Sequence, residues 1–100
     1  MVIIEVKNLQ NNDLIGKLVL SKAGRDKNHL YVIIKVIDSN YVFIANGSTK
    51  TLDKPKKKKL KHLMLLESVN NDLKLAIINN ESANLQIKRF LKLRGIVKEG

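Results

Sequence analysis

The stretch from residue 14 to residue 47 reads LIGKLVLSKAGRDKNHLYVIIKVIDSNYVFIANG. Its apolar residues come in short runs rich in Val, Ile and Tyr, and turn-forming residues separate the runs. This pattern is typical of a small antiparallel β-structure. It predicts strands over residues 15–20, 30–37 and 41–45, and a later apolar run predicts a further strand over residues 60–66.

Short turns join these predicted strands. Gly24 lies between the first two strands, where a residue without a Cβ allows a sharp reversal. Asp38-Ser39-Asn40 predicts a tight turn, and Asn46-Gly47 predicts a two-residue hairpin turn. Strands of roughly 5–8 residues with short loops close most economically into a small barrel. The expected fold class is therefore mainly β, with a small antiparallel barrel.

The sequence changes character after Leu66. Residues 70–72 and 79–82 are rich in Asn, Asp, Glu and Ser, which are frequent helix caps. Residues 73–78 then predict a short helix, and residues 83–94 a longer one that ends at Gly95. We expect residues 1–66 to form the barrel and residues 67–100 a helical extension packed on it, within a single domain.

The longer predicted helix has an apolar face and a competing interpretation. On a helix, one face would carry Ala83, Ile87, Phe90 and Leu91. A strand is the alternative, because the apolar residues of the same segment also fit a period of two around a bulge at Arg89-Phe90. The two interpretations differ in what they bury, so the structure can decide between them.

The composition favours an anionic partner. The 100 residues suffice for one small domain, and the 44% of apolar residues suffices for a core. The chain has 19 Lys and Arg and 9 Asp and Glu, which gives a formal charge of +10. Such a charge is typical of proteins that bind nucleic acids or anionic membranes. An AT-rich genome would also enrich Lys, so clustering is more informative. Seven of 16 lysines lie within residues 50–61, opposed only by Asp53.

Several classes of function find no support in the residues. The chain has no cysteine, which excludes disulfides, thiolate metal sites and cysteine nucleophiles. No Ser/His/Asp set, phosphate-loop motif or paired carboxylates is found, so we expect neither an enzyme nor a cofactor. His29 and His62 have no acidic neighbours at ligand spacing, which argues against a metal site. With no signal-peptide pattern and no apolar run near ~20 residues, we expect a soluble, cytoplasmic protein.

Two basic segments are the candidate binding site. The first is the glycine loop of residues 21–27, whose Arg25 can bind a phosphate through two hydrogen bonds or stack on an unpaired base. The second is the lysine run of residues 54–62. If residues 56–59 are extended, alternate side chains point to opposite sides, so at most about half of them meet one phosphate strand. The candidate RNA-binding residues are Lys22, Gly24, Arg25, Lys27, Lys54, Lys56, Lys57, Lys58, Lys59 and Lys61.

These segments also have purely structural interpretations. Arg25 could pair with Asp26 or Asp38 and order the loop, and Asp26 is expected to be a loop-capping acceptor. The lysine run could be a solvated connection between strands. Among the aromatic residues, Tyr31 and Tyr41 lie near strand ends and are the candidates for stacking on bases.

Both segments resemble a known family. Residues 14–27, LIGKLVLSKAGRDK, followed by LYVI at residues 30–33, resemble the KOW motif of bacterial RNA-binding proteins that are similar to certain archaeal and eukaryotic large-subunit ribosomal proteins. Residues 52–63, LDKPKKKKLKHL, resemble the second conserved stretch of that family. Many KOW motifs have glycine where this chain has Asn28, and related proteins have Asp-Gly at Asn46-Gly47. Asn tolerates the left-handed conformation, so both turns can form.

The resemblance implies an SH3-like barrel, ribosomal or other structured RNA as the partner, and no catalytic activity. We therefore expect a monomeric, ribosome-associated RNA-binding protein. One alternative is a KOW-type protein-interaction module of the transcription or translation machinery, which would expose an apolar groove. Another is attachment to an anionic membrane through the basic, amphipathic residues 82–94.

Overall fold

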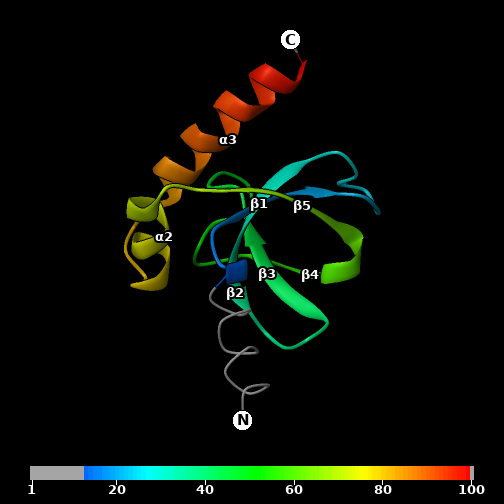
Figure 1. The fold of residues 1–100 in the computed structure, drawn as a ribbon, viewed down its shortest axis with the longest axis horizontal. Coiled ribbons are helices and arrows are strands. Elements are labelled where there is room, and N and C mark those ends of the chain that lie inside the picture. The colour runs from blue at the N-terminus through cyan, green and yellow to red at the C-terminus, as the bar shows by residue number, and fades with distance from the viewer. Residues whose placement is uncertain (1–12, 100) are drawn as a thin grey trace.

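The computed structural model describes residues 13–99 and consists of an antiparallel sheet and two helices (Figure 1). The 3₁₀ turn η1 (Leu60–His62) separates the last two strands. The remaining elements are β1 (Lys17–Ser21), β2 (Leu30–Val36), β3 (Tyr41–Ala45), β4 (Lys56–Lys59), β5 (Leu63–Ser68), α2 (Asn71–Ile78) and α3 (Asn84–Glu99). The predicted mainly-β class with C-terminal helices is confirmed.

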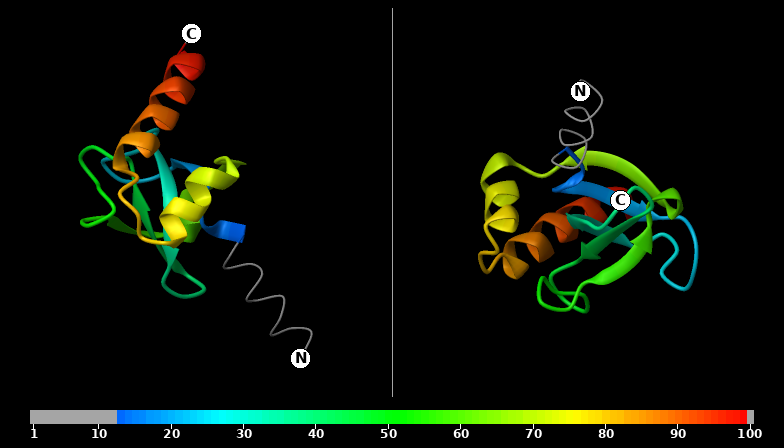
Figure 2. Two further views of the ribbon diagram at one scale, coloured as in Figure 1. Left: turned by 90° about the vertical axis from the view of Figure 1, so that its left-hand side faces the viewer. Right: turned by 90° about the horizontal axis from the view of Figure 1, so that it is seen from below.

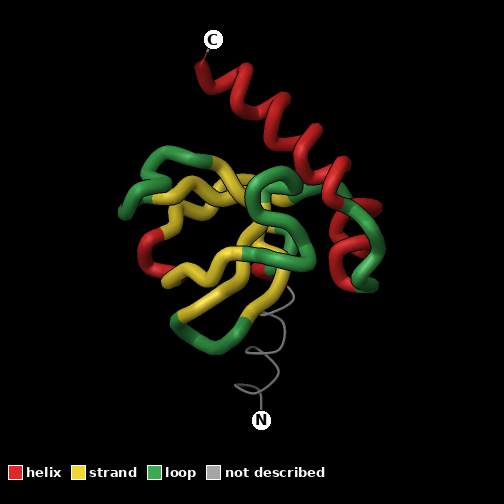
Figure 3. The backbone as a smooth tube through the Cα atoms, turned by 180° about the vertical axis from the view of Figure 1, so that it is seen from behind, coloured by secondary structure: helices red, strands yellow, loops and turns green. Residues whose placement is uncertain are grey.

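The sheet has five strands in the order β4-β3-β2-β1-β5, and all neighbours are antiparallel. β4 and β5 lie at opposite edges, yet only the three residues of η1 join them (Figure 3). A three-residue link spans at most roughly 10–14 Å, whereas the edges of a flat five-stranded sheet are about 19 Å apart. The sheet is therefore strongly curved, and its two edges approach each other at η1.

Each face of the sheet packs into its own apolar cluster. The inner face, turned away from the helices, carries Val19, Tyr31, Ile33, Val42, Ile44 and Leu63. The outer face adds Leu18 and Val32 to a cluster with helical residues that include Ile77, Ile87 and Leu91. Neighbours such as Leu18 and Val19 serve opposite clusters, as strand alternation requires. Figure 2 shows both helices against one side of the sheet.

The helices confirm the predicted C-terminal helix over its strand alternative and correct the sequence prediction at two points. Ala83, Ile87 and Leu91 are buried at four-residue spacing, while Leu85 and Leu93 are exposed, so the strand alternative is wrong. α3 continues past Gly95 to Glu99, because a glycine inside a helix costs only about 1 kcal/mol and does not by itself end it. α2 begins at residue 71 rather than 73, because the Asn70 side chain caps it by accepting from the Leu73 amide at 2.8 Å.

The strand boundaries also differ from the prediction. β4 is a strand made only of lysines, a type that strand propensity disfavours and that the sequence therefore did not reveal. The predicted strand over residues 60–66 is divided instead into η1 and β5. The prediction of a two-residue hairpin turn at Asn46-Gly47 is wrong, because residues 46–55 separate β3 from β4. The Asn46 side chain closes a wider loop by accepting from the amides of Ser48 and Lys50, each at 2.9 Å.

The loop between β3 and β4 is fixed against the start of α3. A Cβ on Gly47 would lie 2.1 Å from the Asn84 carbonyl oxygen, so glycine alone permits this approach. The Leu52 amide donates to Asn84 Oδ1 at 2.9 Å. The loop that leads into β4 is thus positioned by the helix.

Within residues 13–99, no helix combines the length and apolar character that crossing a lipid bilayer requires.

Candidate nucleic-acid interface

Asp26 is the buried centre of the loop between β1 and β2. Its Oδ1 accepts hydrogen bonds from Lys58 Nζ and the Ser21 hydroxyl, both at 2.8 Å, and its Oδ2 accepts from Lys56 Nζ at 2.8 Å. Lys58 Nζ also donates to the Ala23 carbonyl at 2.9 Å. Burial acts to raise the pKa of Asp26, but the hydrogen bonds from Lys56, Lys58 and Ser21 outweigh it and hold that pKa well below its usual range. The ionised carboxylate therefore ties β4 to the loop.

The contacts of Asp26 and Asp38 show whether Arg25 pairs with either carboxylate. Asp26 is an acceptor, as predicted, but its donors are side chains that include lysines 30 and 32 residues away. Asp38 Oδ1 accepts from the backbone amides of Asn40 and Tyr41 at 2.8 and 2.9 Å. Arg25 forms no ion pair with a side chain of residues 13–94 and is exposed, so the interpretation that it orders the loop by pairing with Asp26 or Asp38 is wrong.

The four lysines of β4, which belong to the lysine run, form two pairs that face opposite ways. Lys56 and Lys58 stand opposite buried residues of β3, and they point to the inner face. Lys57 and Lys59 are exposed on the outer face beside Tyr41. Their Nζ atoms lie 4.6 and 6.0 Å from the centroid of the Tyr41 ring, within the range of a cation–π contact. Of the four lysines of β4, only Lys57 and Lys59 are available to an external partner, as strand alternation predicts.

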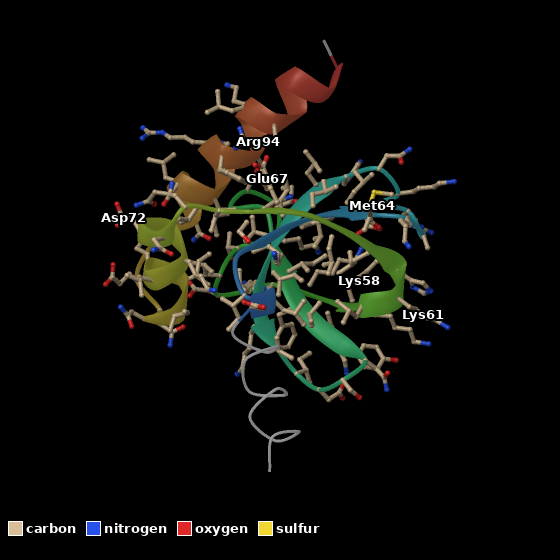
Figure 4. All side chains as sticks on the ribbon, in the orientation of Figure 1. Lys58, Lys61, Met64, Glu67, Asp72 and Arg94 are labelled. Carbon is tan, nitrogen blue, oxygen red and sulfur yellow. The ribbon has the colours of Figure 1, made fainter. Side chains whose placement is uncertain are left out.

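The structure brings the two predicted basic segments together. The Lys22 amide in the β1–β2 loop donates to the His62 carbonyl of η1 at 2.8 Å. Figure 4 shows Lys58 between the strands and Lys61 pointing outward from η1. The exposed candidate residues are Lys22, Gly24, Arg25, Lys27, Lys54, Lys57, Lys59 and Lys61, whereas Lys58 is buried and Lys56 half-buried.

The glycine loop has the backbone conformation that its sequence predicts. Gly24 has φ +87° and Asn28 has φ +74°, so Asn28 adopts the left-handed conformation that was expected to replace a glycine. Two backbone hydrogen bonds close the loop. The Asn28 amide donates to the Ser21 carbonyl at 2.7 Å, and the His29 amide donates to the Asp26 carbonyl at 2.9 Å. The loop is thus a defined frame that presents Lys22, Arg25 and Lys27 outward.

The two tyrosines have different surroundings. Tyr31 is only 3% exposed, and burial together with the neighbouring Asp26 carboxylate raises its pKa to about 12. The expectation that Tyr31 could stack on a base is therefore wrong. Tyr41 is half-buried and lines a hollow of about 540 Å³ whose other walls are Ser39, Asn40, Lys59, Leu60 and Lys61. Ser39, Asn40 and Leu60 were not among the predicted site residues, although a polar turn beside an aromatic strand start was a signal in the sequence.

Among the side chains of residues 13–94, no three of His, Asp or Glu gather as a metal site would require. No model of a known protein family matches the chain, and no curated protein sequence matches it.

Proposed function

We propose that this chain is a non-enzymatic RNA-binding protein of the KOW type, which docks on the phosphate backbone of folded RNA. The proposed partner is ribosomal RNA within the ribosome, and the proposed form is a cytoplasmic monomer. The proposal keeps the two basic segments as the site but uses only their exposed members. Lys56 and Lys58 act inside the fold.

One observation carries the proposal: Asp26, the acidic residue of the basic loop, forms its ion pairs and hydrogen bonds inside the fold. Asp26 is saturated by Lys56, Lys58 and Ser21, so it does not neutralise the cations around it. Within residues 21–27 and 54–62 it is the only acidic residue. Six exposed cations on the joined loop, β4 and η1 are left unopposed, namely Lys22, Arg25, Lys27, Lys57, Lys59 and Lys61. Clustered cations on a rigid frame suit a phosphate backbone.

The fold supports the same proposal. A curved five-stranded sheet whose edge strands meet at a three-residue turn is what an SH3-like barrel requires, and we propose that the sheet closes as one. A barrel loop cannot read the deep, narrow major groove of A-form RNA. Recognition then rests on shape, phosphates and 2′-hydroxyls, which distinguish folded RNA from duplex DNA.

The test is competition binding at near-physiological ionic strength, with a labelled structured fragment of ribosomal RNA. Unlabelled fragment should compete better than duplex DNA or heparin, because shape and 2′-hydroxyls add contacts that charge alone does not supply. If about 4–6 phosphates are neutralised, log K should fall against log salt with a slope of about −3 to −5. Equal competition by heparin, or a flat salt response, would contradict the proposal.

An interaction with a protein partner is the second candidate, because β5 exposes apolar side chains at an edge of the sheet. Met64, Leu65 and Leu66 are 45%, 45% and 41% exposed. A cluster of exposed apolar side chains commonly marks a protein-binding surface. Co-sedimentation with purified ribosomes separates the two candidates. RNA docking predicts loss on replacing Lys57 and Lys59 with Gln, whereas protein docking predicts loss on Leu66→Glu and tolerance of the Gln variant.

Attachment to a membrane through α3 would require its apolar stripe to leave the core. The apolar stripe Ala83, Ile87 and Leu91 of α3 is buried in the cluster shared with the sheet. A helix that inserts at a membrane surface must present that stripe to lipid. We therefore propose RNA rather than a membrane as the partner.

A further inference from the structure

The hollow beside Tyr41 has walls of unlike chemistry. The turn between β2 and β3 contributes Ser39 and Asn40, the start of β3 contributes Tyr41, and the end of β4 and η1 contribute Lys59, Leu60 and Lys61. Its volume of about 540 Å³ is within the range of small-ligand sites. One aromatic residue, one aliphatic residue, two neutral residues that can form hydrogen bonds and two lysines thus line one hollow.

The walls of the hollow are tied together by hydrogen bonds. The Leu60 amide donates to the Asn40 carbonyl at 2.8 Å, which joins η1 to the β2–β3 turn. Asp38 closes that turn by accepting from the amides of Asn40 and Tyr41. The hollow is therefore preformed, and a ligand need not order these backbone segments on binding.

Charge selects the kind of ligand. None of the six lining residues is acidic, and Asp38 at the turn directs its Oδ1 to backbone amides. Lys57 Nζ lies over the Tyr41 ring at 4.6 Å but Lys57 does not line the hollow, whereas Lys59 lines it and its Nζ is farther from the ring centroid, at 6.0 Å. An occupant must then combine a flat unsaturated ring, polar edges and a negative charge at one side.

We infer that this hollow holds one unpaired nucleotide of the bound RNA, with its base stacked on Tyr41 and its flanking phosphates on Lys59 and Lys61. Ser39 and Asn40 are placed to hydrogen-bond the edge of the base. The inference rests on the proposed RNA-binding function and adds to it: the protein selects folded RNA that exposes an unpaired base next to a helical stem. Paired bases do not enter, because both of their faces are stacked in the helix.

The experiment compares two RNAs with the full chain: a hairpin with 2-aminopurine in its loop, and a blunt duplex with the same stem and the same number of phosphates. Wild-type protein should bind the hairpin about 5- to 100-fold more tightly, the range for one stacked base, and should quench the 2-aminopurine fluorescence. Tyr41→Ala should abolish both the preference and the quenching, while the variant still binds the duplex through the exposed cations. Tyr41→Phe should retain both.

Phe43 supplies the matched control. It lies on the same strand and face as Tyr41 and is also half-buried, but it lines a different hollow with Ile34 and Pro55. Phe43→Ala should keep the hairpin preference, and circular dichroism should show all variants folded. Should Tyr41→Ala unfold, Tyr41→Phe and the quenching by wild-type protein decide the result.

The outcomes separate this inference from the proposed function. If both RNAs bind equally and the fluorescence is unchanged, the hollow does not hold a base, while RNA docking stands. If neither RNA binds, the proposed function fails. If poly-glutamate removes the hairpin preference at equal charge concentration, the hollow takes an acidic peptide instead and the inference is overturned.

Discussion

Lys58 Nζ lies 2.8 Å from Asp26 Oδ1, although the two residues are 32 positions apart, and both side chains are more than nine-tenths buried. A buried pair of this kind is worth little against a well-packed apolar pair, but removal of one partner is costly because the other charge is left without compensation. The contact therefore fixes where β4 sits relative to the glycine loop.

Asp26→Asn should destabilise the protein by about 3–5 kcal/mol, because it leaves the Lys58 ammonium buried without a counter-charge. The measurement is the free energy of unfolding in urea. Asp53→Asn is the matched control, since Asp53 is exposed and forms no ion pair with a side chain of residues 13–94, and its effect should stay within about 0.5 kcal/mol. Similar losses in both variants would mean that the buried contact is not formed.

Stability should fall in acid because of the same carboxylate. The pKa of Asp26 is lower in the folded chain than in the unfolded chain, where it is about 3.9. The folded state thus gains stability above that value and loses it as pH falls toward the folded pKa. Urea midpoints measured from pH 7 down to acid should drop below about pH 4 in the wild type. The drop should be smaller in Asp26→Asn, and identical pH profiles would contradict this account.

Tyr31 should resist ionisation. Its pKa is raised from 10.0 to about 12, so the folded state binds the phenolic proton more tightly than the unfolded state does. The resulting stability is present below pH 10 and is lost as pH rises from 10 to about 12. Tyr41→Phe leaves Tyr31 as the only tyrosine, so tyrosinate absorbance then reports it alone. Titration near pH 10 while the chain is still folded would show that Tyr31 is not buried beside Asp26.

The two halves of the proposed RNA surface should respond differently to mutation. Arg25→Ala should weaken binding to the structured ribosomal RNA fragment by roughly 1–3 kcal/mol, the range for one well-placed arginine contact. Replacing Lys57 and Lys59 with Gln should lower affinity for specific and non-specific RNA by similar factors and make the salt slope shallower by about 1.5–2. Binding constants at several salt concentrations test both. Unchanged binding by folded Arg25→Ala would exclude the loop as the site.

Gly47→Ala should be more destabilising than Gly24→Ala. Both glycines have positive φ, which costs a Cβ-bearing residue about 1–2 kcal/mol. At Gly24 the nearest atom to an added Cβ is the Lys58 Nζ at 3.4 Å, whereas at Gly47 it is a carbonyl oxygen of α3 at 2.1 Å. Forcing α3 away adds about 1–3 kcal/mol. Urea unfolding of the two variants gives the comparison, and equal losses would show that the β3–β4 loop does not rest on α3.

Sequence analysis predicted the parts of the fold that local patterns encode. Strands rich in Val and Ile and the stripe Ala83, Ile87 and Leu91 follow from periodicity, and the turn at Asn28 follows from residue type. β4 could not be predicted in this way, because its four lysines form a strand only when they pair with β3 and when Lys56 and Lys58 bind Asp26. The hollow at Tyr41 likewise depends on η1 meeting the β2–β3 turn, a contact between distant segments that no local pattern contains.

The alternation within β4 has a consequence for how this sequence can change over time. Positions 56 to 59 repeat one residue type, yet they form two interleaved sets under different constraints. Positions 57 and 59 can vary among related chains as the partner changes, without disturbing the frame. Positions 56 and 58 both pair with Asp26, so a loss of charge at position 58, the more buried of the two, should appear together with a substitution at position 26. A stretch that looks like a simple repeat thus holds two positions coupled to Asp26 beside two free ones.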